Sequence, residues 1–414
     1  MSLIGTTAAD WRKPAHRDPN VLRWVAAYTA SVAGDSVYFL SLAWAAAAAG
    51  GPSAAGWVTA VGALPRALLM LAGGVIADRF GPRPTIIVSD AIRCVFILVA
   101  AYLLWAASPG LWLLLPLAAV FGIVDALFMP AVGALPPRIT RPDQLGRVQA
   151  MRSLAVRAGN LAGPAIAGAA LTTGRPALAF AVAGALFLLS LVLLIAVRTR
   201  PLPAGKAGCE AGDKPAWQDF KDGLAYIRRH RVLAPLLTVI GLSEMCFSGP
   251  VGLALVLLAD ERGWGAPSVG WMLGAFSVGG AVGAIALAAR PRLDRAGPVC
   301  AAFFALTAAA TATLPAMPGP LPATCVAALI GTASGMAGIV AHTLVQTHSD
   351  PDYLGRVTAV LTLGTVGLSP LMFPLTGIAA SAWGTGYVLV GCAAITASAA
   401  VTMTARQSLR RATT

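Results

Sequence analysis

Ionisable side chains inside long apolar blocks are the residues of this sequence whose type and position could do chemistry. A charged group at membrane depth costs a few kcal/mol on insertion scales, so it normally faces a partner or a water-filled cavity. Asp35 and Glu244 carry carboxylates that could take up protons on one side of a membrane and release them on the other. We predict a proton-coupling and substrate cavity formed by Asp35, Glu244, Arg66 and Asp125, in which the first two acids exchange protons for substrate. The ionisable groups in such blocks are Asp35, Arg66, Arg93, Asp125, Arg157 and Glu244, with Asp90 near the edge of its block.

The arginines leave more than one interpretation of these acids open. Arg66 lies at a depth close to that of Asp35, so the two could form a static ion pair, or Asp35 could simply contact substrate. For Asp125, a structural pair with Arg93 is the favoured interpretation, because both lie toward the same side of adjacent blocks. Glu244 could recognise a cation instead of carrying protons.

The composition shows which elements must hold these side chains. The chain has 414 residues, of which 57% are hydrophobic and 11% are charged, against about 25% charged in an ordinary soluble domain. The apolar residues come in blocks of about 20, the length of a helix that crosses a hydrocarbon core. We predict an all-α polytopic membrane protein with twelve spans, which excludes a soluble globular protein. The spans are 21–48, 54–77, 85–106, 111–135, 148–171, 176–198, 232–258, 267–289, 297–316, 321–344, 357–380 and 384–405.

Basic residues indicate how these spans are oriented. Most of the 30 Lys and Arg residues fall in the two terminal segments and in every second loop, which is the pattern of cytoplasmic segments. We therefore predict a multi-pass protein of the plasma or inner membrane with both termini in the cytoplasm. Orientation signals and contacts with anionic lipid then explain the net charge of +13. We expect no nucleic-acid partner, and we expect the protein to function as a monomer.

A nine-residue segment occurs twice in the chain. Residues 142–150 read PDQLGRVQA and residues 351–359 read PDYLGRVTA, each on an inner loop just before a predicted span. A chance match would not also fall at the equivalent topological position, so the chain is predicted to contain a duplicated unit. The repeat-loop residues are Asp143, Gly146, Arg147, Asp352, Gly355 and Arg356.

The repeat predicts two parallel halves. The offset between its copies also relates Asp35 to Glu244, so these acids are expected at equivalent depths near the interface of the halves. We predict an N-terminal six-helix half over 1–198 and a C-terminal six-helix half over 232–414. Between them, 199–231 is expected to form a cytoplasmic linker that contains an amphipathic helix.

Two glycine-rich segments carry a family resemblance. The loop after the second predicted span reads GGVIADRFGPRP and resembles the signature between spans two and three of the major facilitator superfamily, with Pro82 inserted. The fifth span reads GNLAGPAIAG and looks like the motif of antiporters in that superfamily, with Ala-Gly in place of the final glycine pair. The matching loop residues are Gly73, Gly74, Asp78, Arg79, Gly81 and Arg83, and those of the antiporter-like motif are Gly159, Gly163, Pro164 and Gly168.

The resemblance implies two six-helix halves around a central cavity, with the first of these segments acting as a loop that latches the inner gate. The pattern is most similar to drug:proton antiporters and to siderophore (enterobactin-type) and macrolide exporters. It implies a secondary active transporter that exports small amphipathic molecules, drugs or siderophores, by alternating access, with the proton gradient as its energy source. A proton-coupled importer (symporter) of a small metabolite is the alternative.

A membrane enzyme is a less favoured alternative. The chain has four histidines without an H-E-x-x-H motif, and it contains no Walker A loop. Its six cysteines form no C-x-x-C pair, so neither a metal site nor a disulfide framework is indicated. We expect no enzymatic activity, no cofactor and no metal, and we expect the partners to be a small-molecule substrate and the lipid bilayer.

Overall fold

The computed structural model consists of helices and short connections, with no strand among the residues that it describes. Ten helical stretches in this part of the chain are long and apolar enough to cross a membrane. The structure describes residues 14–106, 110–141, 144–172, 175–199, 224–230, 232–247, 249–288, 295–350, 353, 357, 360–361 and 369–410. The α-helices are α1 (Pro19–Phe80), α2 (Pro82–Ala106), α3 (Leu111–Ala134), α4 (Pro136–Ile139), α5 (Leu145–Leu171), α6 (Pro176–Ile195), α8 (Leu233–Phe247), α9 (Pro250–Glu261), α10 (Ala266–Ala288), α11 (Ala296–Thr313), α12 (Pro320–His348), α14 (Ser369–Trp383), α15 (Thr385–Ala405) and α16 (Gln407–Arg410).

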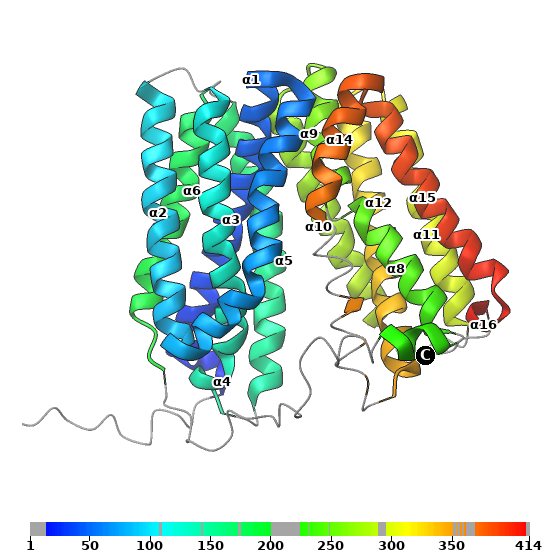
Figure 1. Cartoon of the computed structure of the whole chain (residues 1–414), viewed down its shortest axis with the longest axis horizontal. Helices are drawn as coiled ribbons and strands as arrows, with labels where there is room; N and C mark the ends of the chain where they lie inside the picture. Colours follow the sequence, from blue (N-terminus) through cyan, green and yellow to red (C-terminus); the bar gives the residue numbers. More distant parts are fainter. Residues whose placement is uncertain are drawn as a thin grey trace, which may run out of the picture.

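The long helix α1 contains both of the first two predicted spans. Its backbone leaves the helical region at Gly50 (φ −157°, ψ 18°) and at Gly51 (φ 74°, ψ −171°). A positive φ of this kind suits glycine because it has no Cβ. The chain turns back at this point and continues as a second limb beside the first (Figure 1).

Most of the other predicted spans correspond to single helices. The seventh is divided into α8 and α9, with non-helical backbone at Gly249 (φ −150°, ψ −57°). The eleventh, 357–380, lies partly outside the described residues, and α14 covers its second part. The total of twelve spans therefore stays a prediction.

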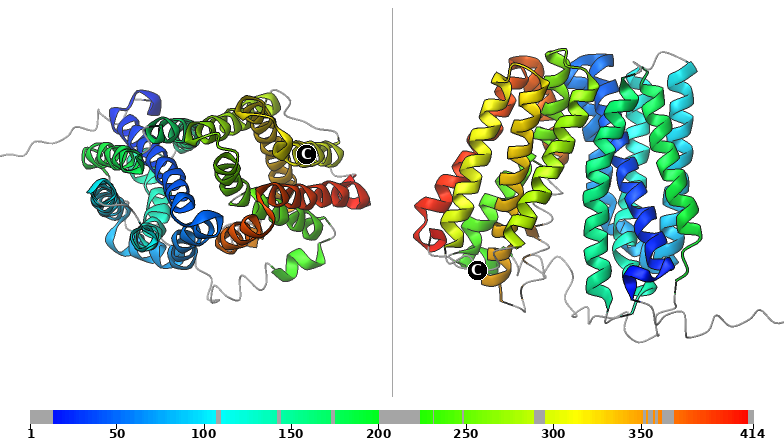
Figure 2. Two further views of the ribbon diagram at one scale, coloured as in Figure 1. Left: turned by 90° about the horizontal axis from the view of Figure 1, so that it is seen from above. Right: turned by 180° about the vertical axis from the view of Figure 1, so that it is seen from behind.

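The helices gather into two groups that lie side by side (Figure 1). In the first group, α1 packs against α3, α5 and α6, and α2 packs against α3 and α6. In the second group, α10 packs against α12, and α11 packs against α12 and α15 (Figure 2). The two groups meet where α1 contacts α14 and α9, and where α5 contacts α10. A site between the groups therefore draws side chains from distant parts of the sequence.

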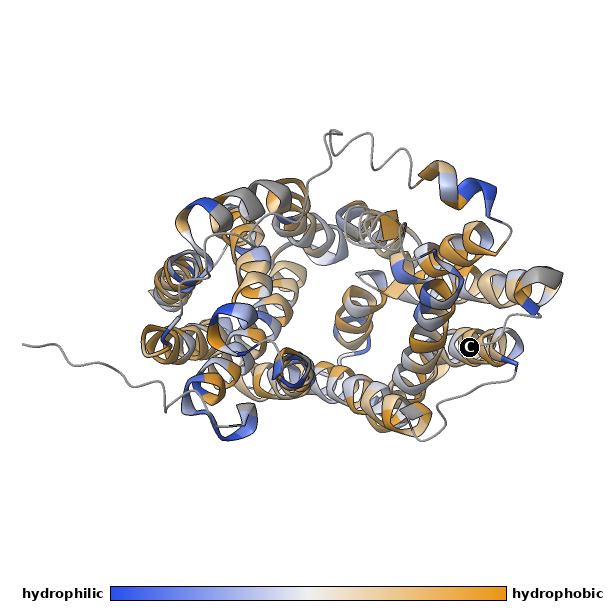
Figure 3. Ribbon diagram, turned by 90° about the horizontal axis from the view of Figure 1, so that it is seen from below, coloured by the Kyte–Doolittle hydropathy of each residue, from blue (hydrophilic) through white to orange (hydrophobic). Residues whose placement is uncertain are grey.

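Hydrophobic residues occur along all the helices, including those at the outside of the two groups (Figure 3). Large residues such as Trp112, Ile285 and Leu321 are exposed. Water would disfavour so much exposed apolar surface, whereas hydrocarbon accepts it, and helices satisfy their own backbone hydrogen bonds there. The structure is that of a multi-pass membrane protein.

Most of the predicted linker, 199–231, lies outside the described residues. Its end is helical over 224–229, where Ile227 is buried in an apolar cluster with residues of α8 and α12. The ring of Tyr226 stacks on that of Tyr353, with centroids 4.4 Å apart. The described end of the linker thus packs on the protein, and the amphipathic surface helix stays a prediction.

Candidate functional site

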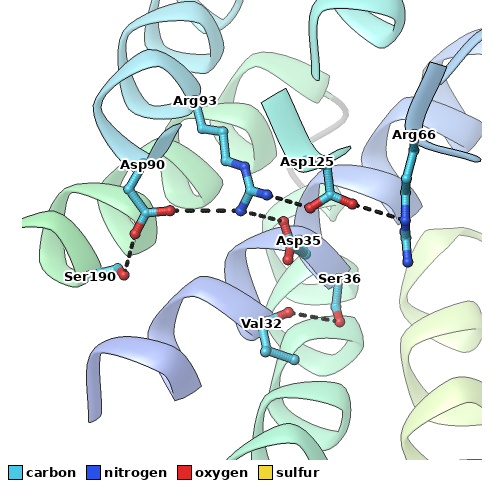
Figure 4. Close-up of polar contacts among 8 residues, drawn as sticks. All are labelled: Val32, Asp35, Ser36, Arg66, Asp90, Arg93, Asp125 and Ser190. Atoms are coloured by element: carbon cyan, nitrogen blue, oxygen red, sulfur yellow. Dashed lines mark hydrogen bonds and ion pairs between the residues drawn. The ribbon is translucent and has the colours of Figure 1, made fainter. Parts of the chain in front are cut away.

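A buried guanidinium forms the centre of a charge cluster in the first helical group. Arg93 on α2 has a fully buried side chain. Its Nη1 lies 3.5 Å from Oδ1 of Asp35 on α1 and 3.7 Å from Oδ1 of Asp90 on α2. Its Nη2 donates a hydrogen bond to Oδ1 of Asp125 on α3 (Figure 4). Carboxylates from three helices therefore converge on one side chain.

Aromatic rings cover the rest of the Arg93 guanidinium. Its central carbon lies 4.0 Å from the ring centroid of Phe128, 5.2 Å from that of Phe121 and 5.6 Å from that of Phe187. A cation is attracted to an aromatic face, and more strongly so away from water. A buried charge without such partners would cost several kcal/mol. Side chains of α1, α2, α3 and α6 thus fix this arginine in one position.

Arg66, on the second limb of α1, extends the cluster. Its Nε lies 3.0 Å from Oδ2 of Asp125 (Figure 4). The predicted structural pair between Asp125 and Arg93 is confirmed. The alternative in which Arg66 pairs with Asp35 is wrong, because Asp125 takes Arg66 and Asp35 takes Arg93 instead.

A close approach of two helices places Arg66 beside Asp125. A Cβ on Gly122 of α3 would lie 2.0 Å from the carbonyl oxygen of Gly62 on α1, so only a residue without a side chain allows this contact. Asp125 follows Gly122 by about one helical turn, and Arg66 follows Gly62 by about one turn on the facing limb. The glycine contact therefore brings the two charged side chains together.

Asp90 is a full member of the cluster, although the sequence placed it only near the edge of its block. Its side chain is completely buried. Ser190 Oγ on α6 donates a 2.5 Å hydrogen bond to its Oδ2. The signal available in the sequence was the spacing of three residues from Arg93, which puts both side chains on one face of a helix.

The cluster contains one more acidic group than basic groups. The carboxylates of Asp35, Asp90 and Asp125 face the guanidiniums of Arg66 and Arg93. Asp35 is the most exposed acid, with 21% of its side chain exposed against 3% for Asp125 and 0% for Asp90. Its Oδ1 is buried and has no hydrogen-bond partner. One proton added to this group of five would balance its formal charge.

A cavity of about 420 Å³ lies between the two helical groups. Its wall combines α1 and α5 of the first group with α8, α9, α10 and α14 of the second. Ligand sites for small molecules typically have volumes of about 300–1,000 Å³. Its aromatic, polar and charged lining residues are Phe39, Phe247, Phe276, Phe373, Ser36, Thr59, Asn160, Ser277 and Arg66.

Arg66 belongs to both the cavity wall and the charge cluster. Its side chain is 33% exposed, and of the described residues that line the cavity it alone carries a formal charge. The predicted cavity acids Asp35, Asp125 and Glu244 lie outside this lining. Asp35 is adjacent in sequence to the lining residue Ser36, and Asp125 lies behind Arg66.

Glu244 is separate from the cluster around Arg93. It is half-buried on α8, and it interacts electrostatically with His342 on α12. The structure thus gives the second helical group an acid of its own, but it does not bring this acid together with Asp35. Among the described residues, no group of three His, Cys, Asp or Glu side chains is arranged to hold a metal ion.

The antiporter-like motif makes two different helix contacts. A Cβ at Gly159 would lie 2.7 Å from Val32, and one at Gly163 would lie 2.4 Å from Ser36, so both glycines let α5 approach α1. Pro164 and Gly168 instead meet the backbone of α10 in the second group. One part of the motif therefore packs on α1, the helix that carries Asp35, and the other part packs on α10 of the second helical group.

The predicted gating loop forms a tight corner between α1 and α2. Gly81 has a φ of 89°, and Pro82 begins α2. Arg83 Nη2 donates a 2.9 Å hydrogen bond to the carbonyl oxygen of Ile195 at the end of α6. This contact lies within the first group, and the role of the loop as a gate stays a prediction. Gly73 and Arg79 lie in the last part of α1, and the surroundings of Gly74 and Asp78 lie outside the description.

Of the six predicted repeat-loop residues, the structure describes two, both in the first copy. Gly146 and the exposed Arg147 lie in the first turn of α5. The repeat residues outside the description are Asp143, Asp352, Gly355 and Arg356.

Two groups of apolar helices with a cavity between them, and with charges buried beside that cavity, define a polytopic membrane transporter. The family model of the Major Facilitator Superfamily matches residues 24–374. The chain belongs to the Major Facilitator Superfamily, as its glycine-rich motifs predict.

Proteins with a similar sequence include enterobactin exporters, and solved proteins with a similar structure include nucleoside and xylose transporters. The chain is 25% identical to enterobactin exporter EntS of Escherichia coli O1:K1 over 340 residues, 78% of each chain. It has the same similarity to EntS of Shigella boydii serotype 18. The solved nucleoside transporter NupG has a TM-score of 0.70 at 10% identity, over 94% of this chain and 98% of that one. The inward-open xylose transporter XylE from Escherichia coli has a TM-score of 0.65 at 14% identity, over 94% and 95%. These structures share the fold.

Proposed function

We propose that the protein exports small amphipathic molecules in exchange for protons, by alternating access in the plasma or inner membrane. The cavity between the helical groups binds substrate and opens to each side in turn, with the proton gradient as the energy source. In this proposal both termini lie in the cytoplasm and the protein acts as a monomer. The halves 1–198 and 232–414 move relative to each other around the linker 199–231.

The position of Arg66 is the observation that carries this proposal. The surplus carboxylate of the cluster gives a proton a binding place, and Arg66 brings one end of the same cluster into the cavity wall. A change of charge in the cluster therefore changes the potential in the cavity. A proton and a cavity ligand can then alter each other's affinity, and this coupling is reciprocal. We assign proton binding to Asp35 because it is the most accessible acid of the cluster.

Export is the direction that the sequence favours. The curated relatives at 25% identity are named as enterobactin exporters, and the Gly-Pro motif of α5 resembles that of antiporters. Import with protons uses the same kind of acids, so direction needs its own measurement. Cells with and without the protein should be compared for accumulation of a compound found in a growth screen. We expect lower accumulation in expressing cells and loss of the difference when the proton gradient is collapsed.

Everted membrane vesicles test the coupling. Transport of that compound is measured across a defined pH gradient for the native protein and for Asp35→Asn and Glu244→Gln, which keep side-chain size and remove the titratable group. We expect Asp35→Asn to abolish the part of transport that depends on the gradient. Asp260→Asn, at an exposed position near the end of α9, is the matched control and should transport normally. Undiminished gradient-driven transport in both Asp35→Asn and Glu244→Gln would contradict the proposal.

A further inference from the structure

We propose that the cavity selects uncharged aromatic amphipaths that carry a hydrogen-bond acceptor, and that Arg66 sets this preference. The inference rests on the proposed function, because it takes the cavity to be the substrate site. It names the chemical class of the substrate, which neither the fold nor the relatives define.

The apolar part of the cavity is suited to a flat aromatic body. Phe39 on α1, Phe247 on α8, Phe276 on α10 and Phe373 on α14 all contribute to the lining. Aromatic rings prefer offset or edge-to-face contact with one another. Rings from four helices therefore favour a ligand that presents an aromatic or similarly apolar surface on several sides.

The polar part of the cavity calls for an acceptor on the ligand. Ser36 Oγ donates to the carbonyl oxygen of Val32 (3.1 Å) or to Oδ1 of Asn160 (3.3 Å). Ser277 Oγ donates to the carbonyl oxygen of Asn160 (3.1 Å). These hydroxyl groups have acceptors within the protein. Arg66 uses its Nε on Asp125, and its terminal nitrogens lie beyond that contact (Figure 4), so its remaining donors can serve a ligand acceptor.

The charges around the cavity disfavour a ligand of either sign. A ligand cation would approach the Arg66 guanidinium in the cavity wall and be repelled at short range. A ligand anion would gain that contact, but it would also face a cluster with three carboxylates for two guanidiniums, in which Asp125 already holds Arg66. An uncharged carbonyl or amide oxygen accepts a hydrogen bond from Arg66 without either penalty.

A matched set of three ligands tests this selectivity. One naphthalene scaffold carries a carboxamide, an ammonium or a carboxylate group, and binding to the purified full-length protein in lipid nanodiscs is measured by calorimetry at mildly alkaline pH. We expect the carboxamide to bind about tenfold more tightly than either charged compound, which is the size of one hydrogen bond to a charged group. An ammonium compound that binds as tightly as the carboxamide would overturn the proposal, and so would absence of binding by all three.

Variants then identify the residue responsible. Arg66→Gln should raise the affinity of the ammonium compound relative to the carboxamide about tenfold, whereas Arg66→Lys keeps the charge and should retain the exclusion. Asp125→Asn removes one of the three acids of the cluster and the partner of Arg66, and it should raise the relative affinity of the carboxylate. Arg157→Gln, at an exposed position of α5 outside the lining, is the matched control. Equal affinity ratios in Arg66→Gln and Arg157→Gln would overturn the assignment.

The binding experiment is independent of the transport experiment. It is made at equilibrium without a proton gradient, and size-exclusion chromatography of each variant confirms that it is folded. If transport does not depend on the proton gradient but the protein still prefers the carboxamide, the proposed function is refuted and this inference is not. Retained gradient-driven transport with no effect of Arg66→Gln on selectivity would refute this inference alone.

Discussion

Gly270 on α10 meets the backbone of α5 at the contact between the two helical groups. A Cβ at this position would lie 2.4 Å from the carbonyl oxygen of Pro164 and 3.3 Å from Cα of Gly168. Real Cβ atoms essentially never approach another heavy atom closer than 3.0 Å. The carbonyl oxygen belongs to the backbone and cannot rotate away as a side chain would. Gly270→Ala therefore forces α5 and α10 apart by several tenths of an ångström.

This substitution raises the free energy of the conformation in which α5 and α10 touch. Overpacking of this kind costs about 1–3 kcal/mol, whereas replacing glycine by alanine within a helix stabilises it by roughly 0.5–1 kcal/mol in either conformation. The clash thus shifts the ratio of separated to touching conformations by roughly 5- to 150-fold. Gly338→Ala on α12 is the matched control, because a Cβ there has no atom within 4 Å.

Labelling of the cavity measures this shift. A cysteine-free protein with Ser277→Cys, which places a thiol in the cavity lining, is treated with a membrane-impermeant maleimide. The reagent is added on the side opposite the end of α15, where the first turns of α10 lie (Figure 1). We expect Gly270→Ala to raise the labelling rate at least about fivefold and Gly338→Ala to leave it unchanged. Equal rates in the two variants would refute the reasoning.

The remaining predictions concern the stability of the fold. Arg93→Leu leaves the buried Asp90 and Asp125 and the partly buried Asp35 without their shared partner. We expect unfolding to become easier by about 3–5 kcal/mol, measured as a lower thermal midpoint in detergent. The double variant Arg93→Leu/Asp125→Leu removes one of these acids as well. A smaller loss of stability in the single variant than in the double variant would contradict this reasoning. Burial and the neighbouring His348 lower the pKa of His230, whose Nδ1 accepts a 3.2 Å hydrogen bond from the backbone N–H of Leu233 at the start of α8. The unfolded chain then binds this proton more readily, so the thermal midpoint should fall as pH drops below about 6.5, and an unchanged pH dependence in His230→Gln would contradict that account.

The positions of the helices could be predicted because the membrane imposes a length on each apolar block. The predicted span 111–135 became α3 (Leu111–Ala134), and the span 176–198 became α6 (Pro176–Ile195). The pair of Arg93 and Asp125 could be predicted as well. Both residues lie toward the same side of adjacent spans, where an unpaired charge would be costly.

The direction in which each helix face turns could not be predicted from one sequence. Arg66 and Asp35 share a depth, yet Arg66 pairs with Asp125, because the contact between Gly62 and Gly122 turns that side of α1 toward α3. Such a contact depends on how two helices cross, and apolar periodicity says little about it when a helix is apolar all round.

The cavity was equally hidden in the sequence. Its lining includes Phe276 and Phe373, which come from helices far apart in the chain, and neither stands in a motif. Among the lining residues, Arg66 carried a signal as a charge within a span, and Pro164 carried one as part of the antiporter-like motif. Of the four predicted cavity residues, the structure places Arg66 in the lining and the three acids outside it.

Proton movement caused by substrate is the most direct test of exchange at the charge cluster. Everted vesicles are energised to an acidic interior, and a pH-sensitive dye follows the interior when the transported compound is added. The native protein and Asp260→Asn should release protons from the vesicles on addition, and Asp35→Asn should release none. Equal release in Asp35→Asn, or further acidification of the interior with the native protein, would contradict proton-coupled export through this cluster.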